Sequence, residues 1–308
     1  MKNFFYTCCL ILLSVPSFGQ FATYKAEEDR IGKLKSCSML VIGVDNPAAS
    51  KWVKFQENAA KYWSLTPIKV MRYSDAKRFT NKANIATLQY SISTGGTHDK
   101  VGFTMSKGPG GIGNRNPTTN AKSMPLLNIF IYGKEKSGGN GYQPVFSQLA
   151  DNSARPNLSV YTLINFLRVA QAELSRSGKD FDFYDNDKII KKENLAKLQN
   201  EELIIPDDEI IHFPPKKPAA EIKKEFENLT KDLSMAHRIV SVEEADSLIL
   251  NDAPVSIFCY ARFNSEKYIF VIDNVSGELL YKDHSLFTYP IKDKDFADLN
   301  KAYLKAKK

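Results

Sequence analysis

A stretch rich in glycine and asparagine holds the residues of this chain best placed to contact a ligand. Gly108–Gly113 has the G-x-G-x-x-G spacing that lets a backbone approach a pyrophosphate. That chemistry needs a helix directly after the glycines, because its aligned N–H groups hold the phosphate. The sequence continues instead with 114–120, which does not start a helix. We therefore interpret the stretch as a surface loop that binds a partner through Lys107, Asn114, Arg115 and Asn116.

Two short fragments have spacings used by penicillin-binding serine enzymes, in which a lysine activates a serine. They are Ser74–Lys77, with the pattern S-x-x-K, and Lys136–Gly138, with the pattern K-S-G. The Ser-x-Asn element expected between them is missing, and the matching places in the second half of the chain, 243–246 and 275–277, lack both patterns. We interpret the fragments as a helix start and a hairpin turn.

We expect no metal site and no cofactor. The carboxylates of Asp180–Asp187 could bind calcium, but the EF-hand spacing is absent, so we interpret them as a solvated acidic linker. The histidines are well separated, and the sequence has no H-E-x-x-H, C-x-x-C, G-x-S-x-G or phosphate-loop motif. A hydrolase with dispersed carboxylates stays open, because such a pair needs only to be close in space.

Two pairs of residues leave alternatives open. Cys37 and Cys259 can form a disulfide in an oxidising compartment, or they can be two buried free thiols. Trp52 and Trp63 fall on one predicted helix, where they can stack on a sugar or pack against a sheet. We expect packing, because a helix that carries two tryptophans usually buries them.

The amino terminus has the pattern of a secretory signal. A basic start at Met1–Asn3 is followed by an apolar run, Phe4–Val15, and by Pro16–Gly19, which places small residues before the expected cleavage at Gln20. No later stretch approaches the roughly 20 apolar residues that a membrane-spanning helix needs. We expect an exported protein that works in a periplasm or outside the cell.

The composition is that of a globular protein. Hydrophobic residues make up 43% of the chain and charged residues 25%, and the formal net charge is +7. The lysines are spread over both halves, and no arginine-rich stripe alternates with aromatic residues. This pattern argues against a nucleic-acid partner and is compatible with a weak attraction to anionic surfaces.

The chain reads as one unit present twice. Asn46–Phe55 aligns with Lys217–Phe226, with Pro, Ala, Ala and Phe matched at one offset. Around this match, short apolar runs and helical spacings follow each other in the same order in both halves. The order predicts a β-α-β-α-β-β-α unit with a mixed sheet. Its first two strands should be parallel because a helix joins them, and its later hairpin strands antiparallel.

The predicted elements fall at corresponding places. The strands are expected at 38–44, 68–73, 86–92 and 128–132, and at 202–205, 238–242, 255–260 and 268–272. The helices are expected to start at Pro47, Ser74 and Val160, and at Pro218, Glu243 and Asp295. The expected organisation is a signal peptide (1–19), a first α/β domain (20–178) with an insertion at 93–125, and a second α/β domain (188–308).

We expect this protein to be an exported, soluble interaction or scaffold protein without a catalytic site. Its partner in the cell envelope would be a protein or a small molecule. The alternatives are a small-ligand or glycan-binding protein that uses the cleft between the two copies, and the hydrolase named above.

Overall fold

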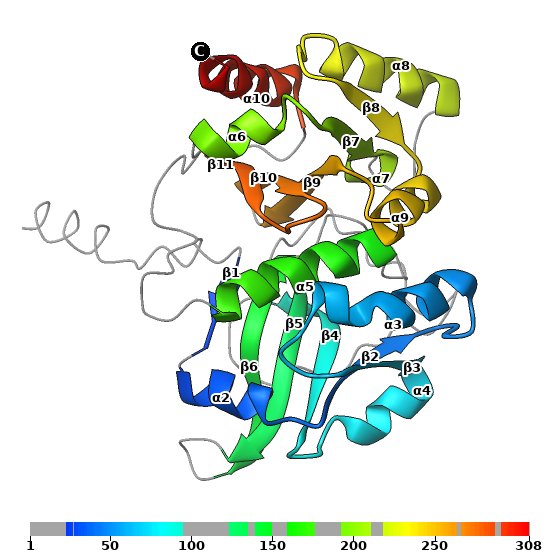
Figure 1. Ribbon diagram of the computed structural model, residues 1–308, viewed down its shortest axis with the longest axis vertical. Helices are drawn as coiled ribbons and strands as arrows, with labels where there is room; N and C mark the ends of the chain where they lie inside the picture. Colours follow the sequence, from blue (N-terminus) through cyan, green and yellow to red (C-terminus); the bar gives the residue numbers. More distant parts are fainter. Residues whose placement is uncertain are drawn as a thin grey trace, which may run out of the picture.

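Two mixed sheets with a layer of helices between them form the framework of the chain (Figure 1). The computed structural model describes residues 23–26, 28–94, 123–134, 139–149, 159–175, 192–210, 218–263, 266–286 and 291–307. No helix in these ranges is long and apolar enough to cross a membrane. The mixed α/β class expected from the sequence is confirmed.

The first half of the chain builds sheet A. Its strands are β1 (Thr23–Lys25), β2 (Met39–Val44), β3 (Ile68–Arg72), β4 (Ile85–Thr94), β5 (Ser123–Lys134) and β6 (Asn140–Leu149). They lie in the order β1-β6-β5-β4-β2-β3. The helices of this half are α2 (Glu28–Lys35), α3 (Ser50–Tyr62), α4 (Tyr73–Ala76), the 3-10 turn η1 (Lys77–Phe79) and α5 (Val160–Ser175).

The second half builds sheet B. Its strands are β7 (Glu202–Pro206), β8 (His237–Val240), β9 (Val255–Phe263), β10 (Glu266–Asp273) and β11 (Leu279–Leu286), in the order β11-β10-β9-β7-β8. The helices are α6 (Lys192–Lys197), α7 (Asp207–Ile210), α8 (Ala219–Thr230), α9 (Val242–Leu250) and α10 (Asp293–Ala306).

Five strands follow the same order in both sheets. β2 is parallel to β3 and β4, as β7 is to β8 and β9, and the strands that follow are antiparallel hairpins in both halves. The parallel pairing of the first two strands and the antiparallel pairing of the hairpin strands were predicted and are confirmed. A β-bulge also falls at corresponding positions, between Ile129 and Phe130 in sheet A and between Val271 and Ile272 in sheet B. Bulges are specific backbone features, so the agreement extends to local geometry.

The predicted unit lacks one strand that the structure contains. In each half, a third antiparallel strand, β6 or β11, follows the hairpin turn, so the observed order is β-α-β-α-β-β-β-α. Gly141 and Pro144 interrupt the pattern of β6, and proline removes a backbone donor that a central strand needs. Pro144 is tolerated here because it lies next to the bulge, opposite Phe130.

Of the helix starts predicted at Ser74 and Pro47, the structure agrees with the first and not with the second. Ser74–Lys77 lies in α4 and η1, as expected for a helix start. Pro47 was placed in the first turn of a helix, but α3 begins at Ser50 with Ala49 as its N-cap. The prediction was wrong by three residues because Pro47 belongs to the turn that leads out of β2, where its fixed φ is equally suitable.

The helix α5 lies between the two sheets and is buried on all its sides. In Figure 1 the layers run from α8 and α10 at the top through sheet B, then α5 with α3, to sheet A. A surface helix has one apolar stripe, whereas a helix that is apolar all round belongs inside a protein. The nearly inaccessible side chains of α5 are Val160, Tyr161, Leu163, Ile164, Phe166, Leu167, Val169, Ala170 and Leu174.

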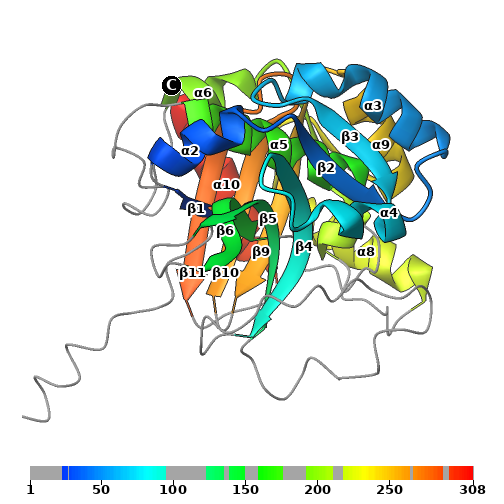
Figure 2. The same ribbon diagram turned by 90° about the horizontal axis from the view of Figure 1, so that it is seen from below.

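The apolar core therefore runs through both halves. One continuous cluster joins residues of α3, α5 and sheet A to residues of α9 and sheet B, among them Phe55, Leu167, Ile249 and Phe270. A second cluster lies on the other face of sheet B, under α6, α8 and α10. Seen from below in Figure 2, α3 and α9 lie side by side, which agrees with their direct contact.

Candidate functional site

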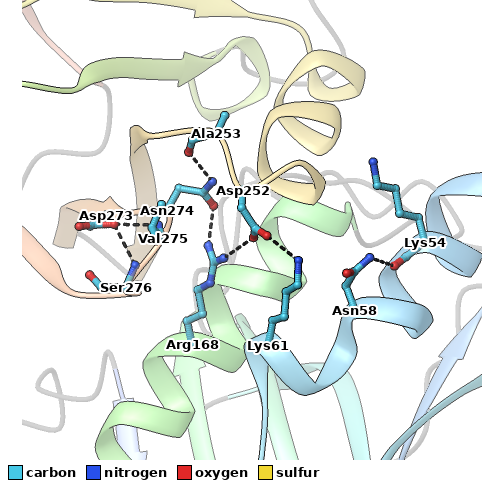
Figure 3. A network of polar contacts seen from close by, with 10 residues as sticks. All are labelled: Lys54, Asn58, Lys61, Arg168, Asp252, Ala253, Asp273, Asn274, Val275 and Ser276. Atoms are coloured by element: carbon cyan, nitrogen blue, oxygen red, sulfur yellow. Dashed lines mark hydrogen bonds and ion pairs between the residues drawn. The ribbon is translucent and has the colours of Figure 1, made fainter.

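The loop residues expected to bind a partner, Lys107, Asn114, Arg115 and Asn116, lie outside the described residues. The acidic stretch 180–187 lies outside them as well. Buried and half-buried polar groups gather instead where the two halves meet (Figure 3). We call this set the interface network, and it consists of Lys51, Lys61, Tyr161, Arg168, Glu209, Asp246, Asp252 and Asn274.

Arg168 is the centre of the network. It projects from α5 toward the second half and is only 6% exposed. Its guanidinium donates to the side-chain oxygen of Asn274 and lies 3.4 Å from a carboxylate oxygen of Asp252. Its Cζ lies 5.0 Å from the ring centre of Tyr62, a cation–π contact. Burial lowers the pKa of Arg168, and the neighbouring charges of Tyr62 and Asp252 oppose that shift. One guanidinium therefore joins α3, α5 and two loops of the second half.

The turn between β10 and β11 approaches α5 closely. A Cβ atom on Gly277 would lie 2.4 Å from Cβ of Arg168, and the φ of Gly277 is +72°. Both conditions favour glycine. The carboxylate of Asp273 holds the turn, because it accepts the N–H groups of Val275 at 2.7 Å and Ser276 at 2.9 Å. The sequence predicted a turn at this place, but not its contact with α5.

Lysines of α3 reach the middle of α9 and the residues that follow it. Lys51 lies 3.0 Å from Asp246, and Lys61 lies 2.8 Å from Asp252, which has a φ of 52° directly after α9. Lys54 donates to the side chain of Asn251. Lys61 and Asp252 are both partly exposed, and an exposed ion pair contributes only about 0 to 1 kcal/mol. We infer that the contacts from α3 fix how the two halves are positioned against each other, and that they add little to the free energy of unfolding.

Asp246 caps a helix that belongs to the other half. Its carboxylate accepts the backbone N–H of Tyr161 at 2.8 Å, in the first turn of α5, where the helix dipole favours a negative charge. Burial raises the pKa of Asp246, while the bonds from Tyr161 and Lys51 act in the opposite direction. The second half thus completes the amino terminus of α5.

Glu209 holds the other end of the same tyrosine. It is 4% exposed, and it accepts the hydroxyl of Tyr161 at 2.9 Å and the backbone N–H of Tyr260 at 2.8 Å. Glu209 lies in α7, in the connection from β7 to α8, which is longer than the corresponding connection from β2 to α3. The residue that joins this tyrosine to sheet B therefore comes from a segment that the first half does not have.

Two buried polar atoms of the interface have no hydrogen-bond partner among the described groups. They are the hydroxyl of Tyr62 and the side-chain oxygen of Asn165. The nitrogen of Asn165 lies 3.7 Å from the sulfur of Cys259, a weak contact. Tyr161, Asn165 and Arg168 are spaced so that they lie on one face of α5. These three polar residues of α5 thus face the second half together.

The network is built to hold two bodies together. Each buried carboxylate accepts hydrogen bonds from several protein groups, so none is an unengaged acid or base. Across the described ranges, His, Cys, Asp and Glu side chains form no group of three that could hold a metal ion. The arrangement orients charges for structure rather than presenting a nucleophile beside a base.

The remaining residues singled out by the sequence are part of the core. Trp52 and Trp63 are both buried, and the indole nitrogen of Trp63 donates to the hydroxyl of Thr66 at 2.9 Å, so neither ring is available to a sugar. Packing was expected and is confirmed. Cys37 and Cys259 are not joined by a disulfide. Burial raises the pKa of the Cys37 thiol, which keeps it protonated near neutral pH.

The sequence contains one signal of this site that belongs to no motif. Arg168 is the only charged residue in the run from Val160 to Ala172. A single arginine inside an otherwise apolar helix needs a partner, because burial of an unpaired charge is costly. The identity of that partner, Asp252 with Asn274, follows only from the fold.

Comparison of the chain with protein-family models, with curated proteins and with solved structures finds no match.

Proposed function

We propose that the chain is an exported, non-catalytic scaffold that consists of two copies of one α/β unit stacked in tandem. The shared strand order and the corresponding β-bulge support a common origin for the two halves. On this proposal, the helix layer of the first copy serves as the support on which the sheet of the second copy rests. The partner is a protein of the cell envelope.

The observation that carries the proposal is the closed boundary between the halves. α5 is buried between the two sheets, and one apolar cluster runs through both. Small-ligand proteins with two lobes bind in a cleft where the lobes meet. Here that place is filled by apolar side chains and by the interface network, which favours a rigid support over a glycan or metabolite site in the cleft.

The hydrolase alternative is also less well supported. It needs two carboxyl groups, one protonated and one ionised, that face a substrate. The buried carboxylates Glu209 and Asp246 are engaged by Tyr161, and Asp295 by Lys267 and by the backbone of Lys292. Such bonds fix helix ends and turns, and they leave these acids without a free approach for substrate.

Export is tested by the amino terminus of the purified protein. The complete chain is expressed in a Gram-negative host, and the mass of the periplasmic product is measured. We expect cleavage before Gln20. A product that keeps Met1 and stays inside the cell would contradict export.

The scaffold function is tested with a ligand panel. Thermal unfolding of the wild type is followed with a set of oligosaccharides and small metabolites, and the proposal predicts no increase in Tm. A variant, Asn165→Leu, serves as the matched control, because it alters the interface between the copies without removing a charge. A compound that raises the Tm of the wild type but not that of the variant would establish the ligand-binding alternative.

A further inference from the structure

One exposed stretch of the first half carries basic groups without acidic partners. We call Lys69, Arg72, Lys77, Arg78 and Lys82 the basic strip; all five are exposed. Several other described cations are engaged in ion pairs, for example Lys61 with Asp252, Lys197 with Asp273, and Lys267 with Asp295. Within the described part of the chain, no carboxylate lies within ion-pair distance of a basic-strip side chain. Five positive charges are therefore available to an external partner.

Lys77, Arg78 and Lys82 lie in or directly after a short apolar anchor, whereas Lys69 and Arg72 point to opposite faces of β3. β3, α4 and η1 follow each other directly, and Met71, Ala76 and Phe79 pack with Val41 and Ile85 against sheet A. The anchor holds the backbone of 71–79 against the sheet. Lys77 and Arg78, between Ala76 and Phe79, consequently extend into solvent.

The corresponding elements of sheet B show that the fold does not require this charge. β8 and α9 occupy the equivalent place, and they carry Glu243, Glu244 and Asp246 with a single cation, Arg238. Arg238 is bound by Glu202 and Glu244. The same structural position is therefore acidic in one half and strongly basic in the other, which indicates a role outside the framework.

The chemistry of the basic strip fits a lipid surface better than a protein. Protein interfaces are built around exposed aromatic or apolar side chains. Within 68–82 the large apolar side chains are buried or half-buried, and the exposed large apolar residues, Val53, Tyr142, Val275 and Leu304, lie elsewhere. Clustered lysines and arginines without an apolar centre bind the phosphates of anionic lipids through diffuse electrostatic attraction. We propose that the basic strip binds the protein to an anionic membrane surface through lipid phosphates.

The test compares two variants with the same change in net charge. The first is Lys77→Glu, Arg78→Glu and Lys82→Glu in the basic strip, and the second is Lys294→Glu, Lys301→Glu and Lys305→Glu on the exposed side of α10. All proteins start at Gln20, which keeps every described residue and removes the apolar amino terminus. Binding is measured by co-sedimentation with vesicles of phosphatidylcholine containing about 30% phosphatidylglycerol, an anionic lipid that attracts clustered lysines and arginines.

We expect wild-type binding that falls as salt is added and is absent on pure phosphatidylcholine. The basic-strip variant should bind at least about tenfold more weakly than the wild type. The affinity of the α10 variant should fall less than about threefold, because charges close to the membrane contribute most to binding. An equal loss in both variants would show that only net charge matters and would overturn the proposal. Binding to a polyglutamate peptide without binding to the vesicles would overturn it in favour of an acidic protein partner. Circular dichroism confirms that both variants are folded.

Discussion

Gly277 and Arg168 show how one residue of a turn decides whether two halves of a protein can meet. The turn reaches α5 because glycine accepts a positive φ and because it has no side chain to collide with the stem of the arginine. That approach lets the guanidinium reach Asn274 and Asp252. The interface therefore depends on the absence of a methyl group as much as on the presence of a charge.

We predict that Gly277→Ala destabilises the protein by more than about 1 kcal/mol, because alanine is strained at this φ and its Cβ would meet Arg168. Gly32→Ala is the matched control. It lies in α2 with open space around it, so it should stabilise the helix by up to about 1 kcal/mol. Urea unfolding followed by tryptophan fluorescence measures both. A neutral Gly277→Ala would show that the turn does not contact α5.

The pH dependence of stability should reflect Asp273. Burial alone would raise the pKa of its carboxyl group, but the bonds from Ser276, Lys197 and Val275 outweigh burial and lower the pKa below its usual value. The carboxylate therefore adds stability above the unfolded pKa of about 3.9, and this contribution is lost as the pH falls through the lower folded pKa.

Between pH 7 and pH 3, we expect Asp273→Asn to lose less unfolding free energy than the wild type. The exposed Asp232, changed to Asn, is the control and should follow the wild type. Urea denaturation at several pH values gives the comparison. Parallel curves for wild type and Asp273→Asn would rule out this role of the carboxylate.

At the scale of elements, α5 has the central role. It belongs to the first half by sequence, yet its first turn is capped by Asp246 and its tyrosine is held by Glu209, both from the second half. Its apolar side chains fill the space between the sheets. A helix shared in this way couples the folding of the halves, because neither sheet can bury its inner face without it.

We predict that Leu167→Ala lowers the free energy of unfolding by about 2 to 5 kcal/mol, the usual cost of a large cavity in a core. The loss should appear equally in both halves. Hydrogen exchange over β4 and β9 measures each half separately. Val53→Ala, at an exposed site on α3, should change little. If only β4 loses protection in Leu167→Ala, the halves fold as independent domains.

The elements show which part of the fold the sequence could predict. β2 and β7 are short apolar runs, and these runs predicted strands that are buried in the parallel part of each sheet. β6 and β11 were missed, because Pro144 interrupts the first and Lys282-Asp283 the second. The helix at Val160 was predicted, but its place between the sheets was not. That place depends on contacts such as Tyr161 with Asp246 and Glu209, which join residues far apart in the chain.

At the scale of the whole molecule, the two halves form a stack with polar ends. The inner face of sheet B carries Ile257, Cys259 and Phe270, whereas the corresponding positions of sheet A carry Thr87, Gln89 and Asn128, which are polar but buried. At the other end, α10 exposes Lys294, Asp298 and Lys301, while the equivalent helix α5 is buried. Stacked repeats end in units with polar outer faces.

We therefore predict that the protein does not extend its stack by adding further copies. Sedimentation velocity from low to high micromolar concentration should show one species with the mass of a single chain. A mass that rises with concentration would contradict the interpretation of the outer faces as polar ends.

The central claim is that the interface fixes the two halves as one rigid body. Spin labels at Tyr142→Cys on β6 and Leu304→Cys on α10, both exposed sites, report the distance between the ends of the stack, with Cys37 and Cys259 replaced by alanine. Pulsed electron paramagnetic resonance measures that distance. We predict one narrow distribution that is unchanged by added salt or by any compound of the ligand panel. A broad or two-peaked distribution, or a shift on addition of a compound, would contradict the claim.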